Sequence, residues 1–369
     1  MADSPLVTLP VDHLSEIWPE ALEGRKVGAI LHAASVASDL SHTLTRLEGM
    51  AARGQITLTT LFGPQHGFAN TTQDNMIEWE GYAHPRLRIP IHSLYGEHRQ
   101  PTPEMLANVE VLFLDLMDIG ARYYTFIWTM FLSMRSAEEK GIPMIVADRP
   151  NPIGGTEIEG RPQEDGYLSF VGLHPIPIRH AKTIGELAHQ FQTECFPNLD
   201  LTVLPMTGWD REMNYDDTGL PWAAPSPNMP TLDTAFVYPG MCLLEGTNLS
   251  EARGTTRPFE WFGAPWIDSE ALAAELNDSS LPGVCFRPIS FEPGFQKWAG
   301  EECHGCQLHV RDRQAFRPVA TALSLFETVK SRYPDHFVWK APPYEYEMEK
   351  LPIEILCGRS EPEIFTHTL

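Results

Sequence analysis

The chain has 369 residues, of which 43% are hydrophobic and 21% are charged, so its composition is that of a folded globular protein with room for two domains. Its 49 acidic and 27 basic residues give a formal net charge of −22. This charge argues against nucleic acid as a partner, because phosphate binding needs a basic face. No apolar run is long enough for a transmembrane helix, so we also expect no membrane partner.

The N-terminal stretch carries acidic residues and lacks the basic-then-apolar pattern of a signal peptide. Six cysteines are too sparse for a disulfide framework in a chain of this length. We therefore expect a cytoplasmic protein.

Strand-like and helix-like patterns alternate along the first part of the chain. Apolar runs predict strands at 26–31, 56–61, 109–116, 142–148 and 199–205, and other patterns predict helices at 38–52, 122–140 and 183–195. The last of these helices begins with a capping box formed by Thr183 and Glu186. Buried strands that alternate with helices predict a Rossmann-like parallel sheet covered on both faces.

The periodic pattern stops near Asn214, where we place the domain boundary. The sequence thus predicts a Rossmann-like catalytic domain over 1–213 and a smaller α+β domain over 214–369 that closes the cleft. The second domain is expected to contain a loop-rich stretch at 223–266, helices at 268–276 and 313–332, and strands at 284–291 and 307–311.

Polar residues follow several predicted strands, at the edge where open α/β sheets bind ligands. Gln65 and His66 follow the second strand, between Gly63-Pro64 and Gly67. A tight turn with a satisfied core histidine is an equally good interpretation of this segment alone.

The third strand ends at Asp115, and Asp118, Arg122 and Tyr123 come soon after it. We expect Asp118 to face the cleft, whereas Asp115 is as well explained as a helix cap or a partner of Arg122. Tyrosine rings would suit a sugar site, although they are also common in protein cores.

Three further groups of residues are candidates for ligand binding. Asn151 lies between two prolines after the fourth strand, although a structural turn with Asp148 paired to Arg149 explains this segment equally well. Arg179 and His180 offer another cation at the same edge. The second domain holds a polar group that is either functional or an ion-pair network fixing a long loop: Glu245, Asn248, Arg253 and Arg257.

No cofactor is predicted. The turn after the first strand contains neither a dinucleotide-binding glycine motif nor a Walker lysine. The stretch Cys303-His304-Gly305-Cys306 lacks the second ligand pair that a zinc site needs, so we expect no metal and interpret these cysteines as buried.

Many of these segments carry a family resemblance. In chain order the motifs are FGPQHG, SLYGEHRQPTPEML, DLMDIGARYYTF, DRPNPIGG, EGRP, SFVGLHPIPIRH, TIGELA, PSPNMPTLDTAFVYPG and LLEGTNLSEARGTTRPFEWFGAPW. From about Val27 to the C-terminus the chain resembles the NamZ-type exo-β-N-acetylmuramidases, a glycoside hydrolase family. The resemblance implies a Rossmann-like fold and a peptidoglycan-fragment or muropeptide substrate, from whose non-reducing end β-1,4-linked N-acetylmuramic acid (MurNAc) is removed during cell wall recycling.

The chain departs from the family pattern at two strand ends. The family usually has glutamate, its proposed catalytic acid/base, where this chain has Gln65, and an amide cannot supply the proton. The family's T-N-P motif is also replaced, by the segment around His32. We expect the missing acid in the loop 70–80, which offers Asp74, Glu78 and Glu80. Glu78 and Glu80 flank Trp79, whose ring would exclude water and raise a carboxyl pKa, and Gln65 would orient the substrate.

A MurNAc residue carries a lactyl carboxylate, which an arginine would hold. The candidates are Arg122, Arg179, Arg253 and Arg257. Because of Gln65, two alternatives stay open: an amino-sugar-binding pseudoenzyme, and a recycling hydrolase for a related amino sugar.

Overall fold

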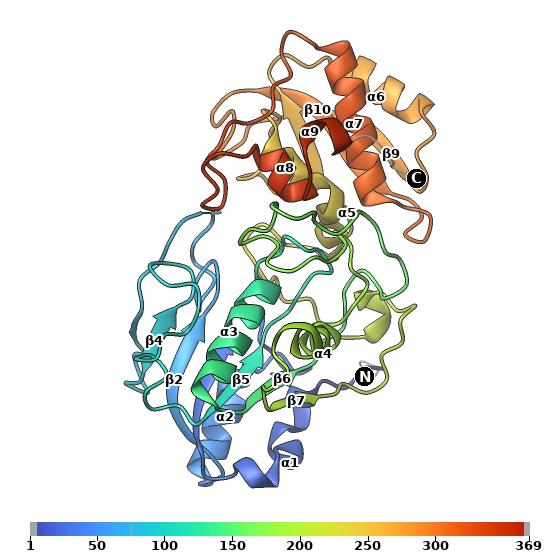
Figure 1. Cartoon of the computed structure of the whole chain (residues 1–369). Helices are drawn as coiled ribbons and strands as arrows, with labels where there is room; N and C mark the ends of the chain where they lie inside the picture. The colour runs from blue at the N-terminus through green and yellow to red at the C-terminus, as the bar shows by residue number, and fades with distance from the viewer. Residues whose placement is uncertain (1–5, 75, 365–369) are drawn as a thin grey trace. The chain divides into compact units, whose positions relative to one another are not determined.

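The computed structural model describes residues 6–74 and 76–364 (Figure 1). The chain forms two units. The first contains the chain up to Gly120, Tyr124–Thr156 and Ala181–Pro227, and the second contains Ala121–Tyr123, Glu157–His180 and the chain from Asn228 on. The second unit therefore draws on three separate parts of the sequence. The domain boundary near Asn214 stays a prediction.

The first unit is built on a seven-stranded sheet with the order β3-β4-β2-β1-β5-β6-β7. Every neighbouring pair is parallel except β3 and β4. The strands are β1 (Lys26–Leu31), β2 (Thr57–Gly63), β3 (Tyr82–Ala83), β4 (Pro90–Ser93), β5 (Val111–Asp115), β6 (Met144–Ala147) and β7 (Leu201–Leu204). The mainly parallel sheet confirms the predicted Rossmann-like fold.

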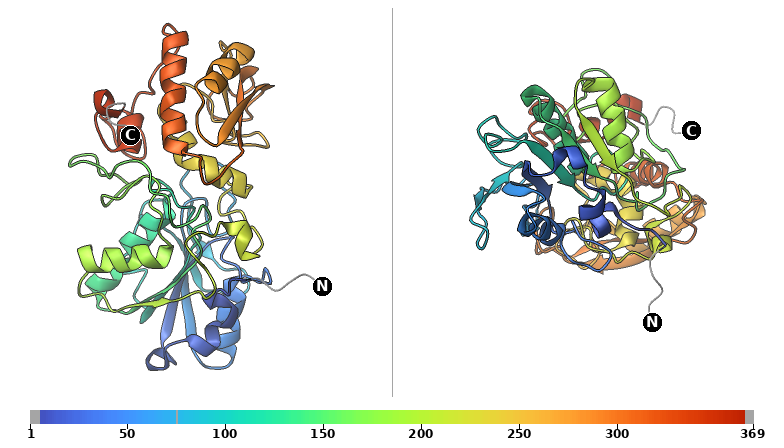
Figure 2. Two further views of the ribbon diagram at one scale, coloured as in Figure 1. Left: turned by 90° about the vertical axis from the view of Figure 1, so that its right-hand side faces the viewer. Right: turned by 90° about the horizontal axis from the view of Figure 1, so that it is seen from below.

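Helices cover both faces of this sheet: α3 and α4 lie on one face and α1 and α2 on the other (Figure 2). Their bounds are α1 (Leu14–Ile17), α2 (Thr43–Ala52), α3 (Phe126–Lys140) and α4 (Ile184–Cys195). Short 3-10 helices are η1 (Pro10–His13), η2 (Glu20–Leu22) and η3 (Tyr215–Thr218). The predicted capping box of Thr183 and Glu186 is confirmed.

Two predicted helices begin later than expected. Helix α2 begins after His42, whose ring accepts the hydrogen bond of the Leu44 amide and so acts as the N-cap. Helix α3 begins only at Phe126, because Gly120 has a φ of 83° and the Arg122 amide bonds to the Ile178 carbonyl instead of a helical partner.

The strand order reverses between β1 and β5, since β2 lies on one side of β1 and β5 on the other. Leu31 is paired in register with Asp115, so the carboxyl ends of these two strands meet. In open α/β sheets ligands bind at such a switch point. The fold thus places the residues after β1, β2 and β5 at the expected ligand-binding edge.

The second unit contains an antiparallel sheet with the order β8-β10-β9. The elements of this unit are β8 (Trp261–Ala264), β9 (Val284–Phe291), β10 (Cys303–Val310), α5 (Leu232–Met241), η4 (Cys242–Gly246), α6 (Ser269–Asp278), α7 (Pro318–Arg332), α8 (Pro352–Cys357) and α9 (Glu361–Ile364). The stretch 223–266, expected to be loop-rich, contains α5, η4 and β8. Helix α5 escaped prediction because it contains Pro239 and is buried from Thr234 to Met241, which leaves no amphipathic period.

Within the described residues, no helix has both the length and the apolar character needed to cross a bilayer.

Candidate active site

Gln65 and His66 lie directly after β2, where tight packing fixes the backbone. A Cβ on Gly63 would lie 2.8 Å from both the Phe68 nitrogen and the Trp79 ring, so only glycine fits there. His66 is buried with a φ of 70°, and its Nδ1 lies 2.7 Å from the Thr72 carbonyl oxygen. Because a carbonyl only accepts, Nδ1 carries the proton of this hydrogen bond.

Gln65 is 7% exposed, and its Oε1 accepts a 2.7 Å hydrogen bond from the Thr125 hydroxyl. Thr125 directly precedes α3 and follows Tyr124. The end of β2 is thereby joined to the segment that leads from β5 into α3.

Asp118 follows β5 and is 4% exposed. Its Oδ2 accepts a 2.8 Å hydrogen bond from the Gly120 amide. Burial raises the pKa of the Tyr124 hydroxyl, the neighbouring Ser226 side chain lowers it, and the charge of Asp118 raises it. Asp118, Tyr124 and Ser226 are therefore close neighbours.

His32, directly after β1, ties these parts together. Its Nε2 accepts a 3.0 Å hydrogen bond from the Met117 amide, and its ring packs edge-on against Phe126 with centroids 4.8 Å apart. Burial, and secondarily the charges of Arg149 and His42, lower its pKa well below the usual value. His32 is thus neutral, and its hydrogen bond from Met117 joins the end of β1 to the end of β5.

We refer to Gln65, His66, Asp118, Tyr124 and Ser226 as the strand-end cluster. It brings together three predicted site residues, namely Gln65, His66 and Asp118. Sequence reasoning missed the roles of Thr125 and Ser226, because their contacts join segments far apart in the chain.

Asp115 and Arg149 form a buried ion pair behind this cluster. Arg149 donates to both carboxylate oxygens of Asp115, which also accepts a 2.6 Å hydrogen bond from Thr43. Asp148 instead accepts from the Thr183 hydroxyl at 3.1 Å. The proposed pairings of Asp115 with Arg122 and of the Asp148 carboxylate with the Arg149 side chain were therefore wrong: Arg149 turns toward β5, where a buried carboxylate needs its charge.

Asn151 is buried and satisfied within its own loop. Its Nδ2 donates to the Lys182 carbonyl at 3.0 Å, and its Oδ1 accepts from the Ile153 amide at 3.2 Å. These contacts match the structural turn that the sequence left open.

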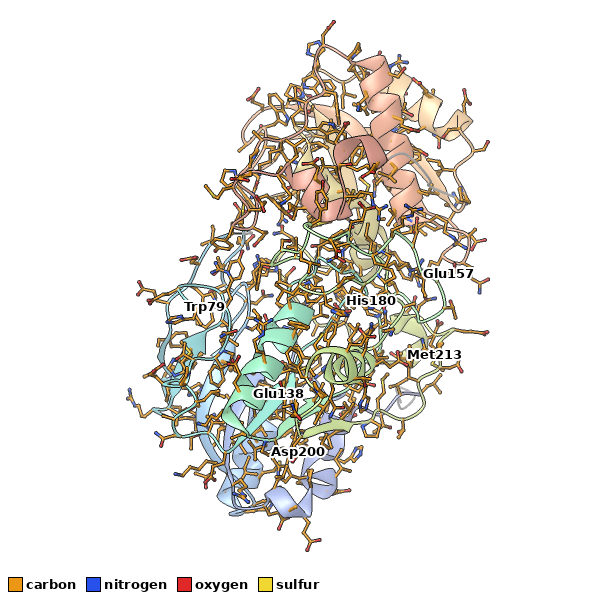
Figure 3. The ribbon with its side chains drawn as sticks, viewed as in Figure 1. Trp79, Glu138, Glu157, His180, Asp200 and Met213 are labelled. Atoms are coloured by element: carbon orange, nitrogen blue, oxygen red, sulfur yellow. The ribbon has the colours of Figure 1, made fainter. Side chains whose placement is uncertain are left out.

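The loop 70–80 returns to the end of β2, as its proximity in sequence suggested. Trp79, labelled in Figure 3, donates from its ring nitrogen to the Pro64 carbonyl at 3.0 Å. The neighbouring Glu78 side chain is 50% exposed and forms a 3.1 Å ion pair with Arg99. The expected apolar shielding of Glu78 by Trp79 is therefore wrong, because the Trp79 ring bonds Pro64 whereas Glu78 is half exposed and pairs with Arg99.

Arg122 and Tyr123 belong to the second unit. Arg122 is fully buried, and its guanidinium donates to the carbonyls of Arg161 at 2.8 Å, Ile176 at 2.9 Å and Leu356 at 2.6 Å. The hydroxyl of Tyr123 donates to the Pro239 carbonyl. Both side chains thus fasten separate segments of this unit to one another.

Arg179 and His180 are also buried in the second unit, and Figure 3 labels His180. The backbone of Arg179 pairs with that of Glu159. Burial lowers the pKa of the Arg179 guanidinium, while the charge of Glu159 opposes this shift. Arg179 therefore has a carboxylate neighbour within its own unit.

Glu245 and Arg253 form a buried ion pair. Glu245 also accepts a 2.7 Å hydrogen bond from Tyr344, while Arg253 donates to Glu251 at 3.0 Å. Lys297 pairs with Glu251 at 2.7 Å. This arrangement matches the ion-pair network that the sequence kept open as the structural alternative.

Asn248 and Arg257 have different surroundings. Asn248 donates to the His336 carbonyl at 2.8 Å and so anchors a loop. The Arg257 side chain is 40% exposed, bonds Glu260 at 3.0 Å, and lines a pocket of about 230 Å³ with His309 and Arg311. Of the four arginines proposed for a carboxylate, Arg257 is the most accessible.

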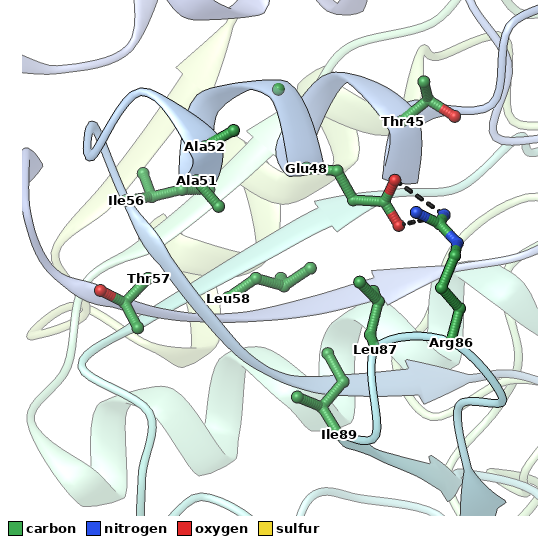
Figure 4. A pocket seen from close by; sticks show the side chains of 11 residues that line it. Thr45, Glu48, Ala51, Ala52, Ile56, Thr57, Leu58, Arg86, Leu87 and Ile89 are labelled. Carbon is green, nitrogen blue, oxygen red and sulfur yellow. Dashed lines mark hydrogen bonds and ion pairs between the residues drawn. The ribbon is translucent and has the colours of Figure 1, made fainter.

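A larger pocket of about 720 Å³ lies at the opposite edge of the sheet from the strand-end cluster. It is lined by α2, by the start of β2 and by residues 86–89, with a Glu48–Arg86 ion pair beside its apolar wall (Figure 4). None of the strand-end cluster residues lines it. This pocket therefore does not extend the candidate site.

Cys303 and Cys306 lie three residues apart on β10, so their side chains point to opposite faces. Burial raises the pKa of both thiols to about 12. Across the part of the chain that the structure describes, no three metal-binding side chains gather into a site.

The fold and the strand-end cluster define a two-unit α/β protein with a polar site at the switch point of a parallel sheet. The chain belongs to the exo-β-N-acetylmuramidase NamZ family: the N-terminal domain profile matches residues 27–233 and the C-terminal domain profile matches residues 236–363. This confirms the family that the motifs suggested.

Individual relatives agree with this assignment. The chain is 47% identical over 336 residues to the peptidoglycan β-N-acetylmuramidase NamZ of Bacillus subtilis (strain 168), covering 91% of this chain and 80% of the relative. A crystal structure of a DUF1343 family protein from Bacteroides fragilis NCTC 9343 superposes with a TM-score of 0.86 at 35% identity, covering 98% of this chain and 91% of the other. A second protein of that family and organism, with a TM-score of 0.72, 23% identity and coverage of 97% and 90%, shares the fold.

Proposed function

We propose that this protein is an exo-β-N-acetylmuramidase that removes β-1,4-linked MurNAc from the non-reducing ends of peptidoglycan fragments. The match of both family domains along one chain is the observation that carries this proposal. The B. subtilis relative is itself named a peptidoglycan β-N-acetylmuramidase. The substrate is then an amino sugar or muropeptide, and recycling of such fragments would take place in the cytoplasm.

Glycoside hydrolysis needs a group that protonates the leaving oxygen. We assign this role to Asp118, because it lies at the switch point in the same cluster as Gln65 and Tyr124. The other carboxylates are worse placed: Asp115 is neutralised by Arg149, and Glu78 is exposed and paired with Arg99. Glu245 is already bound by Arg253 and Tyr344.

His66 contributes a ring whose orientation is fixed by the Thr72 carbonyl. Its position beside Gln65 suits it to bind a sugar hydroxyl, because one ring nitrogen is already oriented by the loop.

The purified protein tests this function with two chromogenic substrates, 4-nitrophenyl β-N-acetylmuramide and 4-nitrophenyl β-N-acetylglucosaminide. We expect turnover of the muramide and at least about a hundredfold lower kcat/KM for the glucosaminide, because that sugar lacks the lactyl group. Faster turnover of the glucosaminide would replace the proposal with a hydrolase for a related amino sugar.

Gln65 supports one alternative, a pseudoenzyme that keeps the sugar site without hydrolysis. Binding of MurNAc without turnover of either glycoside would establish it.

A further inference from the structure

Gln65 presents an unusual combination of burial and partners. Its side chain is 7% exposed, and its Oε1 is bound by the Thr125 hydroxyl at 2.7 Å. The Thr125 hydroxyl makes no capping bond to α3 and instead donates to Gln65. Among the described residues, the bond from Thr125 is the one side-chain hydrogen bond of Gln65, and no group accepts a hydrogen bond from its Nε2.

The bond from Thr125 fixes which end of the amide is available. With Oε1 held by a donor, the two hydrogens of Nε2 remain for another acceptor. This nitrogen is not one of the fully buried polar atoms, so solvent reaches it and an oxygen acceptor of a bound molecule can replace water there. The side chain is therefore prepared for a ligand that brings an oxygen acceptor.

We infer that Gln65 is a specificity residue whose Nε2 donates a hydrogen bond to the acetamido carbonyl oxygen of the sugar. The inference rests on the proposed function for the class of sugar. A MurNAc residue carries two strong acceptors, the acetamido carbonyl and the lactyl carboxylate. A neutral amide suits the neutral carbonyl, whereas a carboxylate is better held by a charged donor such as an arginine.

This role also accounts for an amide at a position where the family usually has glutamate. An ionised carboxylate only accepts hydrogen bonds, so it could satisfy Thr125 but would meet the acetamido oxygen with a second acceptor. The amide satisfies both neighbours. In place of the proton transfer proposed for the family's glutamate, Gln65 recognises the substituent at carbon 2.

Isothermal titration calorimetry of the full chain tests the inference independently of turnover. The two ligands are MurNAc and 3-O-lactylglucose, which keeps the ring and the carboxylate but has a hydroxyl in place of the acetamido group. We expect the parent protein to bind MurNAc at least about tenfold more tightly. Gln65→Met should reduce this ratio to about twofold or less by weakening MurNAc binding alone, since one hydrogen bond accounts for about tenfold.

Three further variants complete the design. Gln314→Met makes the same change at an exposed position of the second unit, and it should leave both affinities unchanged. Thr125→Val keeps the amide but removes the group that orients it, so the ratio should fall only partly. Gln65→Glu should lose the ratio as Gln65→Met does.

The inference would be overturned if Gln65→Met kept the parental ratio of the two affinities. It would also be overturned if a variant with parental Tm lost equal affinity for both ligands. A Gln65→Glu variant that keeps the ratio would also overturn it, because a donor would then be unnecessary. A parent protein that discriminates between the ligands but hydrolyses no muramide would refute the proposed function and leave the inference standing.

Discussion

Arg149 binds both carboxylate oxygens of Asp115, with its Nη2 2.8 Å from Oδ2, and both side chains are buried. The same arginine donates to the Val36 carbonyl at 2.9 Å, so the pair fastens the segment after β1 to the end of β5. The strand-end cluster rests on this connection, because His32 belongs to the fastened segment and bonds to Met117 beside Asp118.

Asp115→Asn should therefore lower the free energy of unfolding by about 3–5 kcal/mol, because it leaves the Arg149 charge buried without its partner. Urea denaturation measures this change. The exposed pair of Arg46 and Asp39 provides the control, and Asp39→Asn should cost less than about 1 kcal/mol. Equal effects of the two changes would show that burial of the Asp115 pair has no energetic consequence.

Asp118→Asn should reduce kcat on a MurNAc glycoside by at least about a hundredfold, the usual scale for loss of a general acid. Glu78→Gln should stay within about threefold of the parent, because an exposed ion pair contributes little. Glu245→Gln should mainly lower Tm. If kcat fell a hundredfold in Glu78→Gln and stayed unchanged in Asp118→Asn, the general acid would lie in the loop 70–80, as the sequence alone suggested.

Arg122→Met should lower stability without changing selectivity, since its guanidinium serves three backbone carbonyls. Burial lowers the pKa of Arg122 to about 10, which still leaves it charged at neutral pH. Thermal unfolding and calorimetry of Arg122→Met with MurNAc and with N-acetylglucosamine separate these effects. A selective loss of MurNAc binding in Arg122→Met would show that Arg122 reaches the substrate.

His32 should make stability depend on pH. Its pKa in the folded state is well below the value of about 6.5 in the unfolded chain. Between these two values the unfolded chain binds an extra proton, so stability is complete above about pH 6.5 and falls as the pH drops. His32→Gln should remove up to ~1.4 kcal/mol per pH unit of this slope. Urea midpoints at pH 7.5 and 5.5 measure it, and parallel slopes for parent and variant would assign the dependence to other groups.

Chelators should leave both activity and Tm unchanged. The two thiols of Cys303 and Cys306 point to opposite faces of β10, and their raised pKa disfavours the thiolates that bind metal. Incubation with EDTA followed by the muramide assay tests this. Loss of activity that stoichiometric zinc restores would contradict it.

Local signals were sufficient for much of the fold. The strand at 26–31 and the strand at 284–291 have the predicted bounds, and the capping box at Thr183 was visible as a pattern of side-chain types. The short strands β3 and β4 were not predicted, because two and four residues are too few for a periodic signal.

The site was harder to predict because its decisive contacts are distant in sequence. Position after a strand correctly brought Gln65, His66 and Asp118 to one edge. The sequence did not indicate that Arg122 donates to the carbonyl of Leu356, 234 residues away. Nor did it indicate that the Arg149 side chain pairs with Asp115 and not with its neighbour Asp148. Such choices depend on which charges are buried together, and residue type alone does not encode that.

The three-segment construction of the second unit limits how the protein can be taken apart. A fragment that starts at Asn228 would lack Arg122 and Tyr123, leaving the carbonyls of Leu356 and Pro239 without their donors. The polypeptide must therefore thread through this unit early and return to finish it late, so its native packing has to await completion of translation. To produce the second unit as a separate polypeptide, Ala121–Tyr123 and Glu157–His180 would have to be joined to the chain from Asn228 on. A single cut in the sequence cannot do this.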